Sequence, residues 1–171
     1  CLRSRFLFLE PLSNDQTILT RKGRDCILLC VEWSTIGLLF GFGEETVYLS
    51  PAPLYHAAPL HYTMLATYNG GTTVIMEKFD PEQSLRLIEE HRVTHSQWVP
   101  IMFVRMLKLD KEVRESYDIS SMQYAIHAAA PCPIEIKEQM IEWWGEVLFE
   151  YYAGTEANGF VQLNSAEYNF V

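Results

Sequence analysis

The chain has 171 residues, the size of a single domain, and 49% of them are hydrophobic while 20% are charged, as in a packed, water-soluble domain. Its formal net charge of −9 disfavours binding to nucleic-acid phosphates or anionic lipid, so we expect no nucleic-acid partner. The apolar stretch 26–42 contains Glu32 and is too short for a bilayer, so no integral membrane span is expected.

The cysteines are too sparse for a metal framework. Cys26 and Cys30 are the only close pair, and no second Cys or His pair follows them at zinc-site spacing. Free thiols are typical of a reducing compartment, so we expect a cytoplasmic protein.

Residues 1–43 show neither helical nor strand periodicity, and we interpret them as an irregular N-terminal segment distinct from the domain at 44–171. From there, short β-branched runs alternate with amphipathic ones. Strands are expected at 46–50, 72–76, 94–98, 123–127 and 147–151, and helices over 57–69 and onward from Pro81, Pro100 and Pro133. Asp80, followed by Pro81 and Gln83, is expected to cap the second helix.

Alternating strands and helices with short connections predict an α/β fold, with a parallel sheet covered by helices on both faces. Right-handed crossovers then bring the loops at the carboxyl ends of the strands to one edge of the sheet. These loops are 50–58, 99–102, 128–133 and 152–159.

The last of these loops carries the strongest chemical pattern. Residues 152–156, Tyr-Ala-Gly-Thr-Glu, combine an aromatic ring, a glycine, a hydroxyl and a carboxylate. A nucleotide site needs a ring to stack on the base, a hydroxyl for phosphate and an anion for a divalent metal. The structural alternative is a tight turn with a solvated glutamate.

Three segments resemble, in order and spacing, motifs of the adenylate-forming superfamily of acyl-CoA synthetases, luciferases and peptide-synthetase adenylation domains. Residues 150–156 resemble its Tyr-Gly-x-Thr-Glu motif, 51–56 its Pro-Leu-aromatic-His segment and 127–131 its Ser-Gly-Ala-Ala-Pro segment. The sequence around 79–82 and 98–100 is similar to sequences of the fatty-acid–CoA ligase branch. The resemblance implies that 44–171 is a partial AMP-binding domain, part of the N-terminal domain of an AMP-forming acyl-CoA synthetase.

The resemblance also implies ligands and residue roles. ATP or AMP, magnesium and coenzyme A would bind, with a fatty acid or another carboxylate as substrate. The adenosine contacts would be Tyr152, Gly154, Ala129, Ala130 and Pro131, and the acyl contacts Tyr55, His56, Trp98, Val99, Pro100 and Met102. Thr155 would bind phosphate and Glu156 magnesium, so that His56, Thr155 and Glu156 are the candidate catalytic residues. His127, Ala128 and Ala153 depart from the motifs, since the family usually has serine at the first position and glycine at the other two.

In this superfamily, a carboxylate attacks the α-phosphate of ATP to give acyl-AMP, and coenzyme A then displaces AMP. The reaction needs an upstream phosphate loop ending in Pro-Lys and a downstream aspartate, hinge and C-terminal domain, none of which occurs in these residues. We therefore expect an internal fragment that is inactive alone, with sheet edges that could support self-association. The alternatives are a non-catalytic acyl- or adenylate-binding or interaction module, and an unrelated flavodoxin-like domain.

Overall fold

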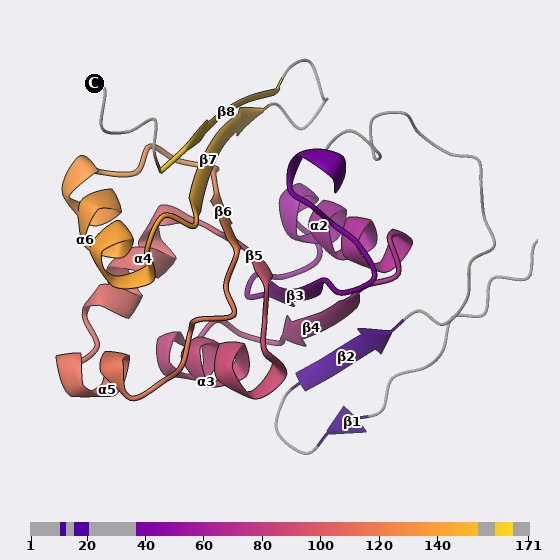
Figure 1. The fold of residues 1–171 in the computed structure, drawn as a ribbon, viewed down its shortest axis with the longest axis horizontal. Helices are drawn as coiled ribbons and strands as arrows, with labels where there is room; N and C mark the ends of the chain where they lie inside the picture. Colours follow the sequence, from indigo (N-terminus) through magenta and orange to yellow (C-terminus); the bar gives the residue numbers. More distant parts are fainter. Residues whose placement is uncertain (1–10, 13–15, 21–36, 154–159, 166–171) are drawn as a thin grey trace, which may run out of the picture. The chain divides into compact units, whose positions relative to one another are not determined.

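The structure is a computed structural model of the 171-residue chain, and it describes residues 11–12, 16–20, 37–153 and 160–165. The chain divides into two compact units, Cys1–Lys78 and Phe79–Val171. Each unit combines hydrogen-bonded strands with helices (Figure 1), which confirms the predicted α/β class.

The first unit is built around two parallel strands and the helix that connects them. Strand β3 (Val47–Ser50) pairs in parallel with β4 (Thr72–Met76), and helix α2 (Ala57–Tyr68) packs on both. Strand β2 (Gln16–Thr20) pairs antiparallel with β4, and β1 (Pro11–Leu12) pairs antiparallel with β2. Figure 1 shows α2 lying over β3 and β4.

Helix α2 ends where the sequence predicts, at the Asn-Gly-Gly run. Gly70 has a φ of +87°, a conformation that glycine adopts without strain. A Cβ at Gly71 would lie 2.7 Å from the carbonyl oxygen of Thr46, so only glycine allows the chain to enter β4 at this point. The buried rings of Phe40, Phe42, Tyr48 and Tyr62, the last of which belongs to α2, pack together in the core of the unit.

The second unit has three parallel strands, β5 (His95–Trp98), β6 (Tyr124–His127) and β7 (Leu148–Ala153), in that order. Strand β8 (Phe160–Asn164) pairs antiparallel with the outer side of β7. The helices of this unit are α3 (Pro81–His91), α4 (Pro100–Leu107), α5 (Lys111–Glu115) and α6 (Ile134–Trp144).

Two features of these strands differ from the prediction. The strands expected from the sequence do pair in parallel within each unit, but β1, β2 and β8 add antiparallel pairs. These three strands, and the short helix α5, lie in segments for which no regular element was predicted. Antiparallel strands at the margin of a parallel sheet are common in α/β proteins.

The core of the second unit is aromatic. Trp98 is fully buried, and its indole ring packs edge-on against Phe79 and Trp144 and at an angle to Phe103. Its indole N–H donates to the hydroxyl of Ser96. Because these side chains come from β5, α4, α6 and the start of the unit, the cluster fixes both helices against the strand.

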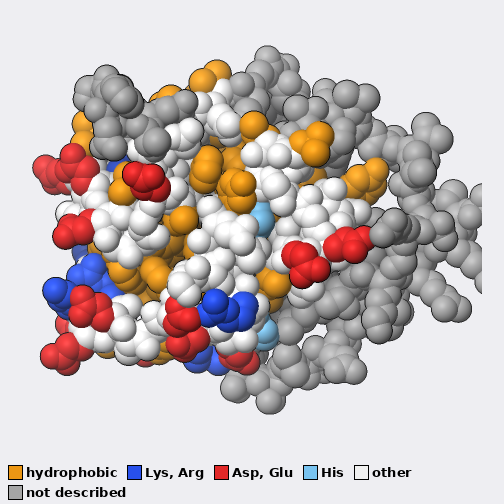
Figure 2. Space-filling view, viewed as in Figure 1, with side chains coloured by type: hydrophobic (Ala, Val, Ile, Leu, Met, Phe, Trp, Pro, Cys, Tyr) orange, Lys and Arg blue, Asp and Glu red, His pale blue; other side chains and the backbone are white. Residues whose placement is uncertain are grey.

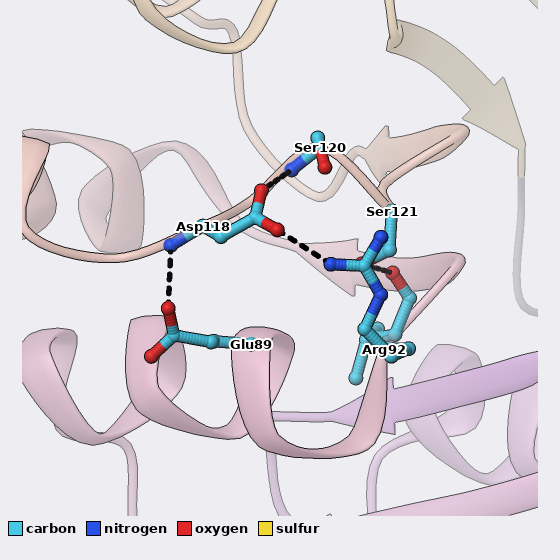
Figure 3. Close-up of polar contacts among 6 residues, drawn as sticks. Glu89, Arg92, Asp118, Ser120 and Ser121 are labelled. Carbon is cyan, nitrogen blue, oxygen red and sulfur yellow. Dashed lines mark hydrogen bonds and ion pairs between the residues drawn. The ribbon is translucent and has the colours of Figure 1, made fainter.

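A polar network at the surface joins the end of α3 to the turn before β6 (Figure 3). Arg92 is bonded to the Asp118 carboxylate at 2.6 Å, and the same carboxylate accepts a 2.9 Å bond from the Ser120 N–H. The Asp118 N–H donates to Glu89 at 3.0 Å. The hydrogen bonds from Ser120 and the Arg92 guanidinium lower the pKa of Asp118 to about 2.

In the face shown by Figure 2, acidic and basic side chains gather over the part of the second unit that contains α3 and α5. Two ion pairs along these helices, Arg86–Glu90 and Lys111–Glu115, belong to this charged surface. Among the helices within the described residues, none is both long enough and apolar enough to span a membrane.

Candidate functional site

The last residues of β5 and β6 lie side by side in the second unit, and β7 continues three residues beyond them to Ala153. The register pairs Trp98 of β5 with His127 of β6, and His127 with Glu150 of β7. The segments that follow therefore leave the sheet at one edge, as expected for a binding site in a parallel α/β sheet. They are the start of α4, the loop 128–133 and the last residues of β7.

The loop after β6 has an unusual backbone. Ala129 has a φ of +78°, a region that alanine rarely occupies and that costs about 1–3 kcal/mol. Ala129, Ala130 and Pro131 are exposed, whereas Ala128 and Cys132 on either side are buried. The two buried residues anchor the loop, and the exposed ones present a small, uncharged surface at the edge of the sheet.

Tyr152 lies on the neighbouring strand, in the last part of β7, and its side chain is 82% exposed. A single exposed ring is ordinary on a protein surface, so Tyr152 is a candidate because it lies beside the loop after β6 at the edge of the sheet. The other candidate residues of this motif, Gly154, Thr155 and Glu156, lie outside the described residues.

The residues expected to border an acyl group after β5 lie mainly in the core. Trp98, Pro100 and Met102 are buried, and Val99 is partly exposed. The Trp98 carbonyl accepts hydrogen bonds from the Gln97 side chain at 2.8 Å and the Ala128 N–H at 3.3 Å. The backbone of Trp98 is thus tied to the loop after β6, while its ring packs inside the unit.

In the first unit, the corresponding loop follows β3. Pro51 and Ala52 are buried, whereas Tyr55 and His56 are exposed and their rings lie 4.4 Å apart, centroid to centroid. His56 occupies the N-cap position of α2, but its side chain makes no capping hydrogen bond. Both residues are therefore exposed at the start of a helix, with their rings against each other.

A buried group beneath the loop 128–133 was not identified as functional from the sequence. The imidazole of His127 has no exposed surface, and neither ring nitrogen has a hydrogen-bond partner among the described residues. Its ring meets Phe103 edge to face, with centroids 5.4 Å apart. Burial lowers the pKa of His127 to about 4, an effect that the Glu150 carboxylate opposes and the Lys137 ammonium reinforces. The imidazole is therefore neutral at pH 7.

Two neighbouring features complete this environment. Lys137 of α6 forms an ion pair with Glu150 of β7. Cys132 is buried with a free thiol, and burial raises its pKa to about 11. The free thiol expected at Cys132 is confirmed, while Cys1, Cys26 and Cys30 lie outside the described residues.

Strand periodicity could have indicated from the sequence that His127 is buried. The ion pair between Lys137 and Glu150 could not be predicted in this way, because it depends on how α6 packs against β7.

The sequence matches a family of known proteins. The sequence profile of the AMP-binding enzyme family matches residues 24–169. The match begins upstream of residue 44, the boundary predicted from the sequence. The probable CoA ligase CCL5 of Humulus lupulus is 32% identical over 119 residues, which are 68% of this chain and 21% of that protein.

Other similar proteins act on different carboxylates. The medium/long-chain-fatty-acid–CoA ligase FadD8 of Mycobacterium tuberculosis is 32% identical over 111 residues, 64% of this chain and 19% of that protein. 4-Coumarate–CoA ligases of Narcissus pseudonarcissus and Oryza sativa subsp. japonica also match. The chain thus spans about a fifth of the length of these relatives.

The fold has a counterpart among solved structures. The inhibitor-bound N-terminal domain of FACL13 from Mycobacterium tuberculosis aligns with a TM-score of 0.69 and 26% identity. The alignment covers 78% of this chain and 33% of that chain. The predicted fold, part of the N-terminal domain of an adenylate-forming enzyme, is confirmed by this likeness.

Proposed function

Because this chain belongs to the AMP-binding enzyme family, we propose that it forms part of the AMP site of an acyl-CoA synthetase. Such an enzyme activates a carboxylate with ATP as acyl-AMP and transfers the acyl group to coenzyme A. The observation that carries the proposal is the pairing of two exposed features at one edge of the sheet. These are the strained loop at Ala129 and the aromatic ring of Tyr152 on the next strand.

The described residues fit an adenine nucleotide. The loop 128–133 carries no charged side chain, so it would not repel a phosphate. Ala129 and Ala130 are small enough for a planar base to approach the backbone, and the ring of Tyr152 could stack on that base. We assign Gly154 and Thr155 to the phosphate side and Glu156 to magnesium by the motif alone.

We assign the acyl side to Tyr55 and His56, supported by the exposure of both rings, and to the segment after β5. Val99 is the partly exposed member of that segment, and the buried residues Trp98, Pro100 and Met102 would lie behind it in the core. A fatty acid is the proposed substrate, supported by the similarity to FadD8. The similarity to 4-coumarate ligases extends the proposed class to other carboxylates.

We further propose that these 171 residues do not complete the reaction alone. The sequence contains no Gly/Ser/Thr-rich loop ending in Pro-Lys before β3. In this family's reaction, positioning and neutralisation of the phosphate charge do most of the catalytic work. A chain without that loop would hold the adenylate without forming it. Self-association through strand edges and a cytoplasmic location stay predictions.

The proposal is tested by separating binding from turnover. The chain is titrated with AMP by calorimetry and is also incubated with decanoate or 4-coumarate, ATP, magnesium and coenzyme A. Saturable AMP binding without release of pyrophosphate is the expected result. Tyr152→Ala should weaken that binding, whereas Tyr68→Ala, which removes an exposed ring from α2, should leave it unchanged. Absence of binding would contradict the AMP site, and pyrophosphate release would contradict the inactivity of the chain.

A further inference from the structure

The ion pair between Lys137 and Glu150 is less exposed than the other ion pairs among the described residues of the second unit. Its two side chains are 15% and 21% exposed, whereas those of Arg92–Asp118 are 58% and 49% exposed and those of Lys111–Glu115 are 76% and 61% exposed. Solvent screens a largely buried pair less than a surface pair, so the attraction between its two charges is stronger. The pair therefore constrains the two elements that it joins.

Lys137 is anchored directly behind the loop 128–133. The backbone N–H of Lys137 donates to the carbonyl oxygen of Pro133 at 3.1 Å, and the N–H of Ile136 donates to the same oxygen at 3.0 Å. Pro133 is both the last residue of the loop and the N-cap of α6. The backbone of Lys137 is thus hydrogen-bonded to the residue at which the loop ends.

Glu150 lies on the strand that carries Tyr152. Both residues lie on β7, two positions apart, so their side chains project from the same face of the strand. Glu150 is also the register partner of His127, the last residue of β6 before the loop begins. The ion pair therefore bridges the far end of the loop to the strand that carries the exposed ring.

We propose that Lys137 and Glu150 are positioning residues of the AMP site, whose ion pair holds the loop 128–133 in register with Tyr152. The inference rests on the proposed function. Neither side chain touches the nucleotide. Their pair fixes the separation between the loop and β7, so that Ala129, Ala130 and the ring of Tyr152 can contact one adenine. A strained residue such as Ala129 keeps its conformation only when its surroundings hold it, and the pair supplies one of those constraints.

The binding test uses variants that remove one charge and keep the side-chain length. Lys137→Met and Glu150→Gln should each weaken AMP binding to the 171-residue chain about tenfold, measured by calorimetry. The reciprocal exchange, Lys137→Glu with Glu150→Lys, should recover most of the affinity, and Lys137→Arg should bind like the parent. Arg92→Ala is the matched control, because it breaks the surface ion pair with Asp118 (Figure 3) and should leave AMP affinity unchanged.

A second measurement needs no ligand. Amide hydrogen exchange at Ala129, Ala130 and Tyr152 should accelerate in Lys137→Met and Glu150→Gln, but not in Arg92→Ala. Unchanged AMP affinity in both charge-removing variants, or unchanged exchange at these amides, would overturn the positioning role. If the parent chain binds no AMP, the proposed function fails, and the exchange rates still decide whether the pair holds the loop.

Discussion

Ala129 is the residue whose backbone points most directly to a site. The sequence singled it out only through the resemblance of 127–131 to a family motif, because no periodicity in the sequence reveals a positive φ. The structure adds a physical reason, since an L-residue at +78° carries strain that an ordinary surface turn would avoid by using glycine.

Valine at position 129 should therefore destabilise the fold, because a β-branched side chain is strongly disfavoured at positive φ. We expect Ala129→Val to lower the free energy of unfolding by about 1–2 kcal/mol. Ala130→Val is the matched control, since Ala130 is also exposed but has no positive φ, and it should change stability by less than about 0.5 kcal/mol. Equal losses in urea titrations of the two variants would show that the strain is absent.

His127 illustrates the opposite case, a residue whose sequence position suggested only a departure from the motif. Its burial without a hydrogen-bond partner in the described part of the chain, together with a pKa of about 4, defines it as a neutral imidazole within the second unit. The charged groups that act on it are Lys137 of α6 and Glu150 of β7, and its ring packs against Phe103 of α4.

This imidazole should make stability depend on pH. The pKa of His127 is lower in the folded chain than its ordinary value of 6.5, so the unfolded chain takes up the proton first as the pH falls. The stabilisation is fully present above pH 6.5 and is lost as the pH falls toward about 4, a loss on the order of 3 kcal/mol.

Urea unfolding of the parent and of His127→Leu between pH 7.5 and 4.5 measures this effect. The parent should lose stability steeply below pH 6.5, and the variant should show a flatter curve over the same interval. Asp118 does not interfere, because its pKa is lowered to about 2 from 3.8, and its contribution is lost only in that more acidic range. Parallel curves for the two proteins would contradict the assignment.

Among the helices and strands, helix α3 shows that local sequence signals can be sufficient to predict where an element begins. Asp80, Pro81 and Gln83 predicted its start, and the structure has Asp80 accepting a 2.9 Å hydrogen bond from the Gln83 N–H. This cap satisfies a helix N–H that would otherwise have no partner within the helix.

Asp80→Ala should cost about 1 kcal/mol of stability, because it removes that hydrogen bond. Asp110 offers a matched control, since it occupies the N-cap position of α5 without a side-chain capping bond. Asp110→Ala should have little effect on the free energy of unfolding measured in urea. A similar loss in both variants would mean that charge at the helix start, and not the cap, provides the stabilisation.

Elements that depend on packing could not be predicted from the sequence. Helix α5 has only five residues and buries none of them, so it has no apolar face for periodicity to detect. Strands β2 and β8 are defined by antiparallel pairing with β4 and β7, which no local signal specifies. By contrast, β3, β4, β5, β6 and β7 are bounded by turn residues and have buried side chains, and their positions were predicted closely.

At the scale of the molecule, the candidate site was predictable where it follows from strand order. Parallel pairing of β5, β6 and β7 brings 99–102, 128–133 and the end of β7 to one edge of the second unit. The Lys137–Glu150 pair was not predictable, because it requires the docking of α6 against β7. The chain spans about a fifth of the length of its CoA-ligase relatives.

We propose that the loop after β6 and the exposed ring on β7 form one adenine site. This proposal can be tested by titrating the isotopically labelled chain with AMP and following the NMR spectrum. Resonances of Ala129, Ala130 and Tyr152 should shift together along one saturable binding curve, while those of Arg92 and Asp118 stay in place. Shifts confined to residues away from the ends of β6 and β7, or no shifts at millimolar AMP, would show that these residues do not form an adenine site.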